Sequence, residues 1–209
     1  MPWTPRIPVV IPQQNFELIG DRIAEILAAE MANQWGLDNT VPKVVSVDIE
    51  RFTTYDGQTE LPAINVNNQS ATYSNRTRNR VDGTYQFNID VYTNATWSAE
   101  DGPGDEYAML LMNRIIGMVR TILSSPAYTR LGFDAPADPI IGTTNVAGFI
   151  VGDKATVKDS LSSVVGRLQF EVTCVEEAIM QTSVPLEVSG STLYVNRAGG
   201  KGFKLLTEI

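Results

Sequence analysis

Two segments of the chain alternate apolar and polar residues in almost the same way. In TYQFNIDVYT, residues 84–93, every second position from Tyr85 to Val91 is apolar. In RLQFEVTCVE, residues 167–176, the apolar positions run from Leu168 to Cys174. A period of two is that of a β-strand with one face on a core and the other in water. Both segments are therefore predicted to be half-buried strands.

Two other segments have the three- and four-residue spacing of an amphipathic helix. The first helix is expected to begin at Asn15 as its N-cap and to run to Trp35, with Gly36 as a natural C-terminal stop. The second is expected to run from near Asp105 to Ser124. Its acidic start suits the positive end of a helix dipole.

Four strands accompany these helices, and they are predicted at Lys43–Thr54, Pro62–Asn67, Gly83–Thr93 and Val165–Glu176. Asp56-Gly57 is expected to form the turn between the first two. The order predicts an α+β fold in which two amphipathic helices pack on one face of a mostly antiparallel four-stranded sheet.

The chain divides into three parts. Residues 1–14 are rich in proline and are expected to form an extended, polyproline-like arm. Residues 15–176 form a single α+β domain, with an insertion at about 127–163 in which Phe149–Val151 is a candidate strand. Residues 177–209 are expected to contain a hairpin of Leu186–Ser189 and Thr192–Asn196, followed by a glycine-rich tail.

The composition excludes much of enzyme chemistry. The chain has no histidine, so histidine bases, histidine-containing triads and histidine metal ligands are all excluded. The single cysteine, Cys174, lies on the apolar face of its strand and is expected to be a small buried residue. Gly199–Gly202 lacks the full spacing of a phosphate-binding loop. We therefore expect no enzyme activity, no metal and no cofactor.

Clustered carboxylates precede and follow the second helix. The four acidic side chains between Glu100 and Glu106, and later Asp153 and Asp159, are interpreted as solvated loop charges and a helix start. The formal charge of the chain is −8, which argues against a surface that grips nucleic acid phosphates. No uninterrupted run of about 20 apolar residues is present, so we expect a soluble protein without membrane contact.

The sequence contains two candidate docking elements. Arg76, Arg78 and Arg80 lie in NRTRNR and would project to the same side of an extended segment. This segment is open to three interpretations: a solvated loop tip, a docking element for an acidic neighbour, or a phosphate contact. The acidic candidate is a row on the first helix, four residues apart, of Glu17, Asp21 and Glu25. We hypothesise that the arginines of one subunit meet an acidic face of the next, a contact that closes into a ring.

The layout resembles the tail terminator (tail completion) proteins of tailed bacteriophages over roughly residues 15–176. The segments that carry the resemblance are NFELIGDRIAEILAAEM, LPAINVNNQ, GTYQFNIDVYT, EYAMLLMNRIIGMVRTIL and GRLQFEVTCVEE. It is a resemblance in the order and texture of the elements, because the family has no short signature motif.

The resemblance implies a virion protein of the tail, near the neck, that is present in the host cytoplasm during assembly. Its copies would form a ring, a hexamer, that caps the tail tube, stops tube polymerisation and joins the tail to the neck. Partners would be the chain itself, the tube protein, and the sheath and neck proteins, while DNA passes through without being read. The alternatives are another head–tail connector, neck or tube subunit, and then a soluble enzyme or a host-side binding module.

Overall fold

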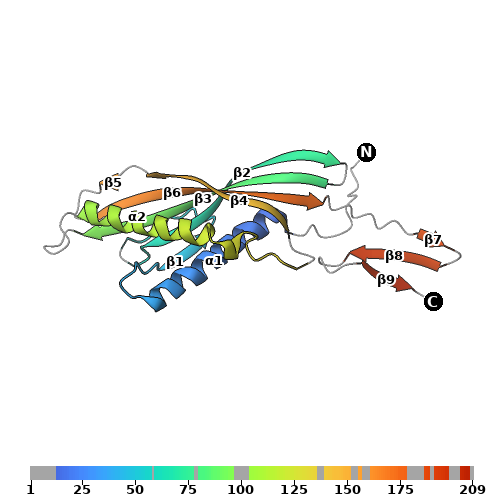
Figure 1. Cartoon of the computed structure of the whole chain (residues 1–209), viewed down its shortest axis with the longest axis horizontal. Helices are drawn as coiled ribbons and strands as arrows, with labels where there is room; N and C mark the ends of the chain where they lie inside the picture. The colour runs from blue at the N-terminus through green and yellow to red at the C-terminus, as the bar shows by residue number, and fades with distance from the viewer. Residues whose placement is uncertain are drawn as a thin grey trace, which may run out of the picture.

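The computed structural model describes residues 13–57, 59–77, 80–96, 104–135, 139–151, 155–156, 161–177, 186–188, 191–197 and 203–207. The elements are α1 Asn15–Leu37, β1 Ser46–Ile49, β2 Ala63–Thr77, β3 Arg80–Thr96, α2 Gly104–Leu123, a 3-10 turn Pro126–Tyr128, β4 Ile140–Val151, β5 Ala155–Thr156, β6 Leu161–Glu177, β7 Leu186–Val188, β8 Ser191–Arg197 and β9 Phe203–Thr207 (Figure 1).

The main sheet has six strands. Five follow the order β1-β2-β3-β6-β4, and the short β5 also pairs with β6. β1 runs parallel to β2, whereas the other pairs are antiparallel. The predicted α+β class is confirmed. The predicted number of four strands is wrong, because β4 and β5 enlarge the sheet, and one of its pairs, β1 with β2, is parallel.

The two similar strands recognised in the sequence are β3 and β6, and they are direct neighbours. Their register is unbroken from Arg80 opposite Glu177 to Thr96 opposite Leu161. Phe87 lies opposite Phe170 within this register. The apolar positions of the two strands thus form two adjacent rows on one face of the sheet.

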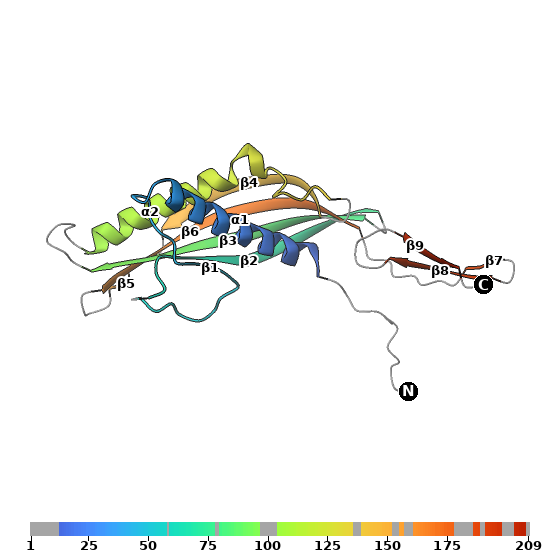
Figure 2. The ribbon, with the colours of Figure 1, turned by 90° about the horizontal axis from the view of Figure 1, so that it is seen from below.

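Both helices lie on the same side of the sheet (Figure 2). α2 contacts β3 and β6, and α1 contacts β1 and β2. The helices cover the apolar rows of the strands. The largest fully buried side chains of this core are Tyr85, Phe87, Phe170, Ile19, Ile23, Leu27, Ile64, Ile89, Met112, Ile115, Leu123 and Leu131. Burial of this apolar surface is the main contribution to the stability of the domain.

The close approach of α2 to β6 depends on Gly166. A Cβ atom at this position would lie 2.3 Å from Met112 Sδ and 2.4 Å from Ile116 Cδ1, closer than packed atoms approach. A larger residue would therefore require the side chains of Met112 and Ile116 to shift.

The predicted helices are present, with small differences at the ends. α1 has Gln14 as its N-cap, so Asn15 is the first helical residue and not the cap. The helix also continues past Gly36 to Leu37, and Asp38 is its C-cap. The Asn15 side chain instead donates a hydrogen bond to the sulfur of Cys174 at 3.3 Å, and Cys174 is buried as predicted.

The first predicted strand is much shorter than expected. Only Ser46–Ile49 of the predicted Lys43–Thr54 is strand, and it pairs in parallel with β2. Asp56-Gly57 does not join two antiparallel strands. It lies in the connection of residues 50–62, which is long enough to return the chain for a parallel pairing.

Two predicted irregular regions contain strands. The region 127–163 includes β4 and β5, so the predicted candidate strand Phe149–Val151 is only the end of a twelve-residue strand. In the C-terminal part, β7 and β8 pair as the predicted hairpin, and β9 adds a third strand in place of the expected tail. Residues 1–12 of the arm, Asp101, Asp153, Asp159 and Gly199–Gly202 lie outside the described residues.

Truncation of either facing phenylalanine tests this core. Phe87 and Phe170 are each 1% exposed, so Phe87→Ala or Phe170→Ala should lower the free energy of unfolding by about 3–5 kcal/mol, through lost burial and a cavity. Urea unfolding of the two variants and the parent chain measures the change. The outward-facing neighbour Gln86 is exposed, and Gln86→Ala provides the control. A free energy unchanged by both phenylalanine variants would contradict the assignment of the buried face.

Candidate functional site

The face of the sheet without helices carries a polar network centred on Asp90. This residue of β3 is 2% exposed. The guanidinium of Arg167, from β6, donates two hydrogen bonds to its carboxylate, from Nε at 2.6 Å and from a terminal nitrogen at 2.8 Å. Asn67 of β2 donates a third at 3.2 Å. Three neighbouring strands are thus joined across this face by one buried carboxylate.

This network stabilises the positive charge of Arg167. Hydrogen bonding to Asp90 raises the pKa of the Arg167 guanidinium, so the guanidinium stays charged. The carboxylate is buried and the guanidinium is partly exposed, and the two hydrogen bonds between them favour one alignment of β3 and β6. Its chemistry is that of a structural clamp, because the carboxylate has no free face toward a substrate.

The connection between β1 and β2 is held against the same face by Arg51. Its guanidinium donates to both carboxylate oxygens of Glu60, at 3.0 and 2.8 Å, and lies 4.1 Å from the centre of the Tyr55 ring. The Asn65 side chain bonds to the backbone of Arg51 in both directions. The Tyr55 ring in turn packs on Tyr92, with centroids 4.9 Å apart.

Hydrogen bonding and burial shift the pKa values of two ionisable groups in this connection. The backbone N–H of Asp56, followed by Arg51, lowers the pKa of Glu60. Burial raises the pKa of Tyr55, with a smaller contribution from its hydrogen bond to Asp48. Glu60 is therefore charged and Tyr55 neutral near pH 7, as the hydrogen bonds require.

The edge of the sheet formed by β4 exposes several large apolar side chains. β4 is IIGTTNVAGFIV and has no charged residue. Phe149, Ile150 and Val151 are 57%, 54% and 42% exposed, and Ile140 is 53% exposed. Since β4 is the last strand of the order, one side of its backbone has no partner strand among the described residues.

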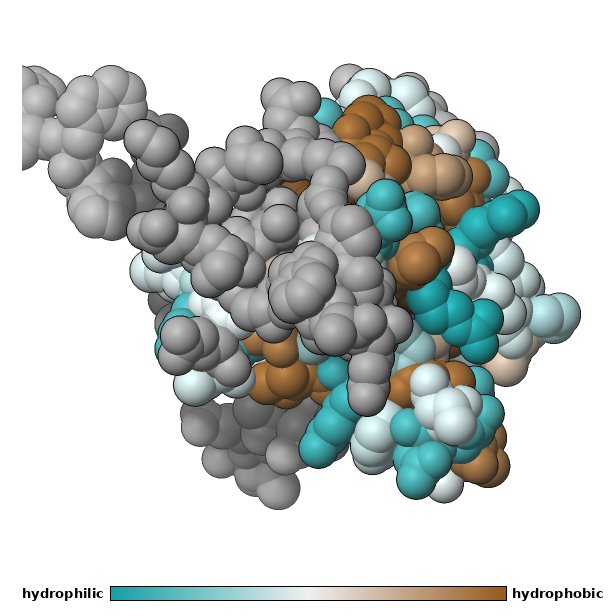
Figure 3. Space-filling model, turned by 90° about the vertical axis from the view of Figure 1, so that its left-hand side faces the viewer, coloured by the Kyte–Doolittle hydropathy of each residue, from teal (hydrophilic) through white to brown (hydrophobic). Residues whose placement is uncertain are grey.

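Edge strands normally carry charges, prolines or a cover that prevents pairing with another chain. β4 has none of the charges and prolines, although two register irregularities interrupt its pairing with β6. Figure 3 looks at the end of the molecule where α2 begins and β4 ends, and hydrophobic atoms lie there at the surface among hydrophilic ones. This edge is therefore suited to contact with another protein surface.

The arginine segment lies at the tip of the β2–β3 hairpin. Arg76 belongs to β2 and Arg80 to β3, and Thr77 pairs with Arg80. Arg78 lies outside the described residues. Because the chain reverses direction here, the expected single extended row of three arginines is wrong.

The acidic row of α1 has local partners. The Glu17 carboxylate accepts the N–H of Gln14 at 2.6 Å and so caps the helix. Asp21 accepts a long hydrogen bond from Gln13, and Glu25 forms an exposed ion pair with Arg22 at 3.3 Å. The three side chains lie along one face of the helix as predicted, but at least Glu17 has a structural role. Arg22 also lies over the ring of Phe133, with its guanidinium carbon 5.1 Å from the ring centre.

Sequence reasoning missed the two surfaces described above. Asp90 and Arg167 occupy polar positions of strands that were recognised, but their pairing required the strand order. The signal for β4 was the run of twelve residues without charge in a chain that is otherwise acidic.

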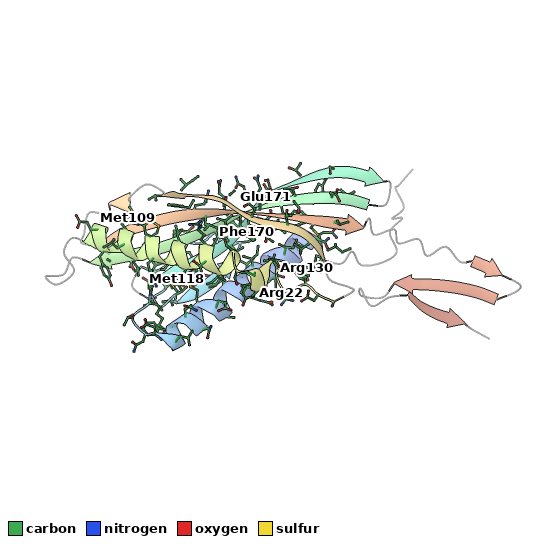
Figure 4. All side chains as sticks on the ribbon, viewed as in Figure 1. Arg22, Met109, Met118, Arg130, Phe170 and Glu171 are labelled. Atoms are coloured by element: carbon green, nitrogen blue, oxygen red, sulfur yellow. The ribbon has the colours of Figure 1, made fainter. Side chains whose placement is uncertain are left out.

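Features of other classes of site are also informative. The described residues contain no group of three or more acidic or thiol side chains placed to hold a metal ion, and none of the described helices could cross a membrane. Two hollows on the described surface have volumes of about 50 and 240 Å³. Both are smaller than the roughly 300–1,000 Å³ usual for ligand pockets. The smaller one is lined by Gln69, Gln86 and Glu171, and Glu171 follows Phe170 on β6 (Figure 4).

Comparison with known proteins gave no family. No protein-family model matches the chain, and no curated protein matches it.

Replacement of Arg167 tests the structural role of the buried carboxylate. Arg167→Met should lower the free energy of unfolding by about 1–3 kcal/mol, because it leaves Asp90 buried without its cation, while the partial exposure of Arg167 moderates the loss. Adding Asp90→Asn to this variant should recover part of the loss. Urea unfolding of the two single variants, the double variant and the parent measures the coupling. Strictly additive effects would contradict a direct interaction.

Proposed function

We propose that the chain is a structural subunit of a bacteriophage tail. Copies form a ring, a hexamer in the family it resembles, which caps the finished tail tube, ends its polymerisation and joins the tail to the neck. The supporting observation is the open, uncharged edge of β4. A strand edge of this kind gives a subunit one half of a contact with another copy, through backbone hydrogen bonds and exposed apolar side chains.

A ring needs two different surfaces that meet head to tail. The two edges of the sheet differ in this way. β1 at one edge has only four residues, and Asp48 is one of them, whereas β4 at the other edge is three times as long and has no charge. Self-pairing of β4 would give only a closed dimer, so the second surface of the ring contact lies elsewhere on the neighbouring copy.

The charge of the chain supports passage of DNA through such a ring. A net charge of −8 repels phosphate, so a genome passing the opening would slide without being held. Another head–tail connector, neck or tube subunit is the second candidate, since the same edge and charge would serve it equally. An enzyme or a host-side binding module is less favoured, because both hollows described above are small.

Removal of the gene from the phage that encodes the chain, followed by complementation, tests the proposal. Without the chain, tubes should be overlong and lack heads. The parent chain should restore normal length, and Phe149→Glu should not, because it places a charge on the open edge. Leu110→Glu is the matched control, since Leu110 is 67% exposed and belongs to α2 and not to β4, and this variant should restore normal length. Electron microscopy of tube lengths is the measurement.

Tubes of normal length in the absence of the chain would contradict a capping role. Restoration by Phe149→Glu as well as by Leu110→Glu would leave a capping role in place, and it would contradict the assignment of β4 as the subunit contact.

A further inference from the structure

A small hollow lies on the face of the sheet that the helices leave open. Its volume is about 50 Å³, and four neighbouring strands, β2, β3, β6 and β4, contribute to it. The residues that line it are Gln69, Gln86, Ala147, Gln169, Phe170 and Glu171. The glutamines and the glutamate give it a mostly polar lining.

A β-bulge on each of the two flanking strands shapes this hollow. The register of β2 on β3 shifts at Gln69, and the register of β4 on β6 shifts at Ala147. Both shifts lie at the level of the Phe87–Phe170 pair, on opposite sides of it. A bulge bends its strand and redirects side chains, so two bulges at one level account for a depression in the sheet.

The hollow contains a carboxylate without a cation. Within the described part of the chain, Glu171 has no hydrogen bond or ion pair through its side chain, and Arg167, the preceding cation on β6, is bound to Asp90. Asn88 lies opposite Gln169 and is 6% exposed, and its side-chain oxygen has no partner among the described residues. This part of the sheet therefore has acceptors that the chain itself does not fill.

The chemistry of the hollow favours a guanidinium group. The guanidinium has several donors in one plane and can bind a carboxylate and amide oxygens at the same time. A hollow of about 50 Å³ offers about four water-sized positions, at roughly 10–15 Å³ for each, and the carbon and nitrogens of one guanidinium match this number. An arginine side chain therefore fits in both charge and size.

The chain carries arginines at the tip of the β2–β3 hairpin. Three of its 16 Lys and Arg residues, Arg76, Arg78 and Arg80, fall within residues 76–80, which is the densest positive charge in the sequence. β2 and β3 continue past the start of α1, so this end of the sheet projects beyond the helices (Figures 1 and 2). A projecting hairpin can reach across the sheet of another copy.

The arginines of one copy cannot reach the hollow of the same copy. The register of β3 with β6 places Arg80 six residues, about 20 Å, from the level of Glu171. Thr77 pairs with Arg80, and Arg76 and Arg78 are its neighbours in the chain, so each is within about 4 Å of that same level. An arginine side chain extends less than about 9 Å, at roughly 1.5 Å per bond. All three arginines therefore fall short of their own hollow.

We propose that the hairpin tip of one copy places an arginine in the hollow of the next copy, against Glu171. Ala147 belongs to β4, so the hollow borders the open edge that is the proposed subunit contact. The tip and the hollow are different surfaces, and a contact between them is head to tail and can close into a ring. This inference rests on the self-association part of the proposed function, and it names the second surface that a ring requires.

Exchange of charge between the two surfaces tests this contact. One chain carries Glu171→Arg, and a second chain carries Arg76→Glu, Arg78→Glu and Arg80→Glu. Each variant alone should self-associate at least about tenfold more weakly than the parent, because like charges then meet. An equal mixture of the two variants should recover association, since each hollow then has a tip of opposite charge available. Sedimentation over a range of concentrations measures the parent, both variants and the mixture.

Two further variants are controls. Glu171→Gln keeps the shape of the side chain and should weaken association by loss of the charge alone. Glu25→Arg makes the same charge reversal at a position on α1 that is 67% exposed, and it should leave association unchanged. Urea unfolding checks that each variant is folded.

Three results would each overturn the inference. They are association of the hairpin-tip variant equal to that of the parent, no recovery in the mixture, and a parent chain that stays monomeric at every concentration.

The two proposals fail separately. Overlong tubes on loss of the gene, together with no recovery in the mixture, would leave the capping role in place and remove the arginine contact. Recovery in the mixture, together with tubes of normal length on loss of the gene, would have the opposite meaning.

Discussion

The unbroken pairing of β3 with β6 is the interaction on which the rest of the structure depends. It places Phe87 against Phe170 and aligns the two apolar rows, so that α2 can pack across both strands at once. The same register brings Asp90 opposite Arg167 on the other face. A shift by one residue would move every apolar side chain of one strand to the polar face and would separate this ion pair. The two faces of the sheet therefore specify the same register independently.

The elements with a clear period could be predicted from the sequence, and those set by tertiary contacts could not. β3, β6 and both helices follow their apolar spacing closely. The direction of β1 is set by the connection that Arg51 and Asn65 hold in place, and a turn signal such as Asp56-Gly57 does not report it. The predicted strand ends at Asn67 because the polar residues 68–77 have no apolar alternation, yet these residues extend β2 through backbone pairing with β3.

The candidate surfaces likewise have some features that the sequence predicts and others that only the tertiary structure shows. The spacing of Glu17, Asp21 and Glu25 places them on one face of α1, and this could be read from the sequence. The cap formed by Glu17 and the reversal of the chain after Thr77 could not. β4 was recognised only at its apolar end, because glycines and two register irregularities interrupt its alternation. Its position at the edge of the sheet, which makes it a candidate contact, is a property of the strand order alone.

The central claim is that the open edge of β4 becomes paired with another subunit on assembly. Hydrogen exchange of the backbone amides measures it directly, by comparison of the isolated chain with its assembled form. Amides of residues 140–151 should exchange more slowly in the assembly, while those of β3, which lies inside the sheet in both states, should be unchanged. Equal exchange of residues 140–151 in the two states would contradict the claim.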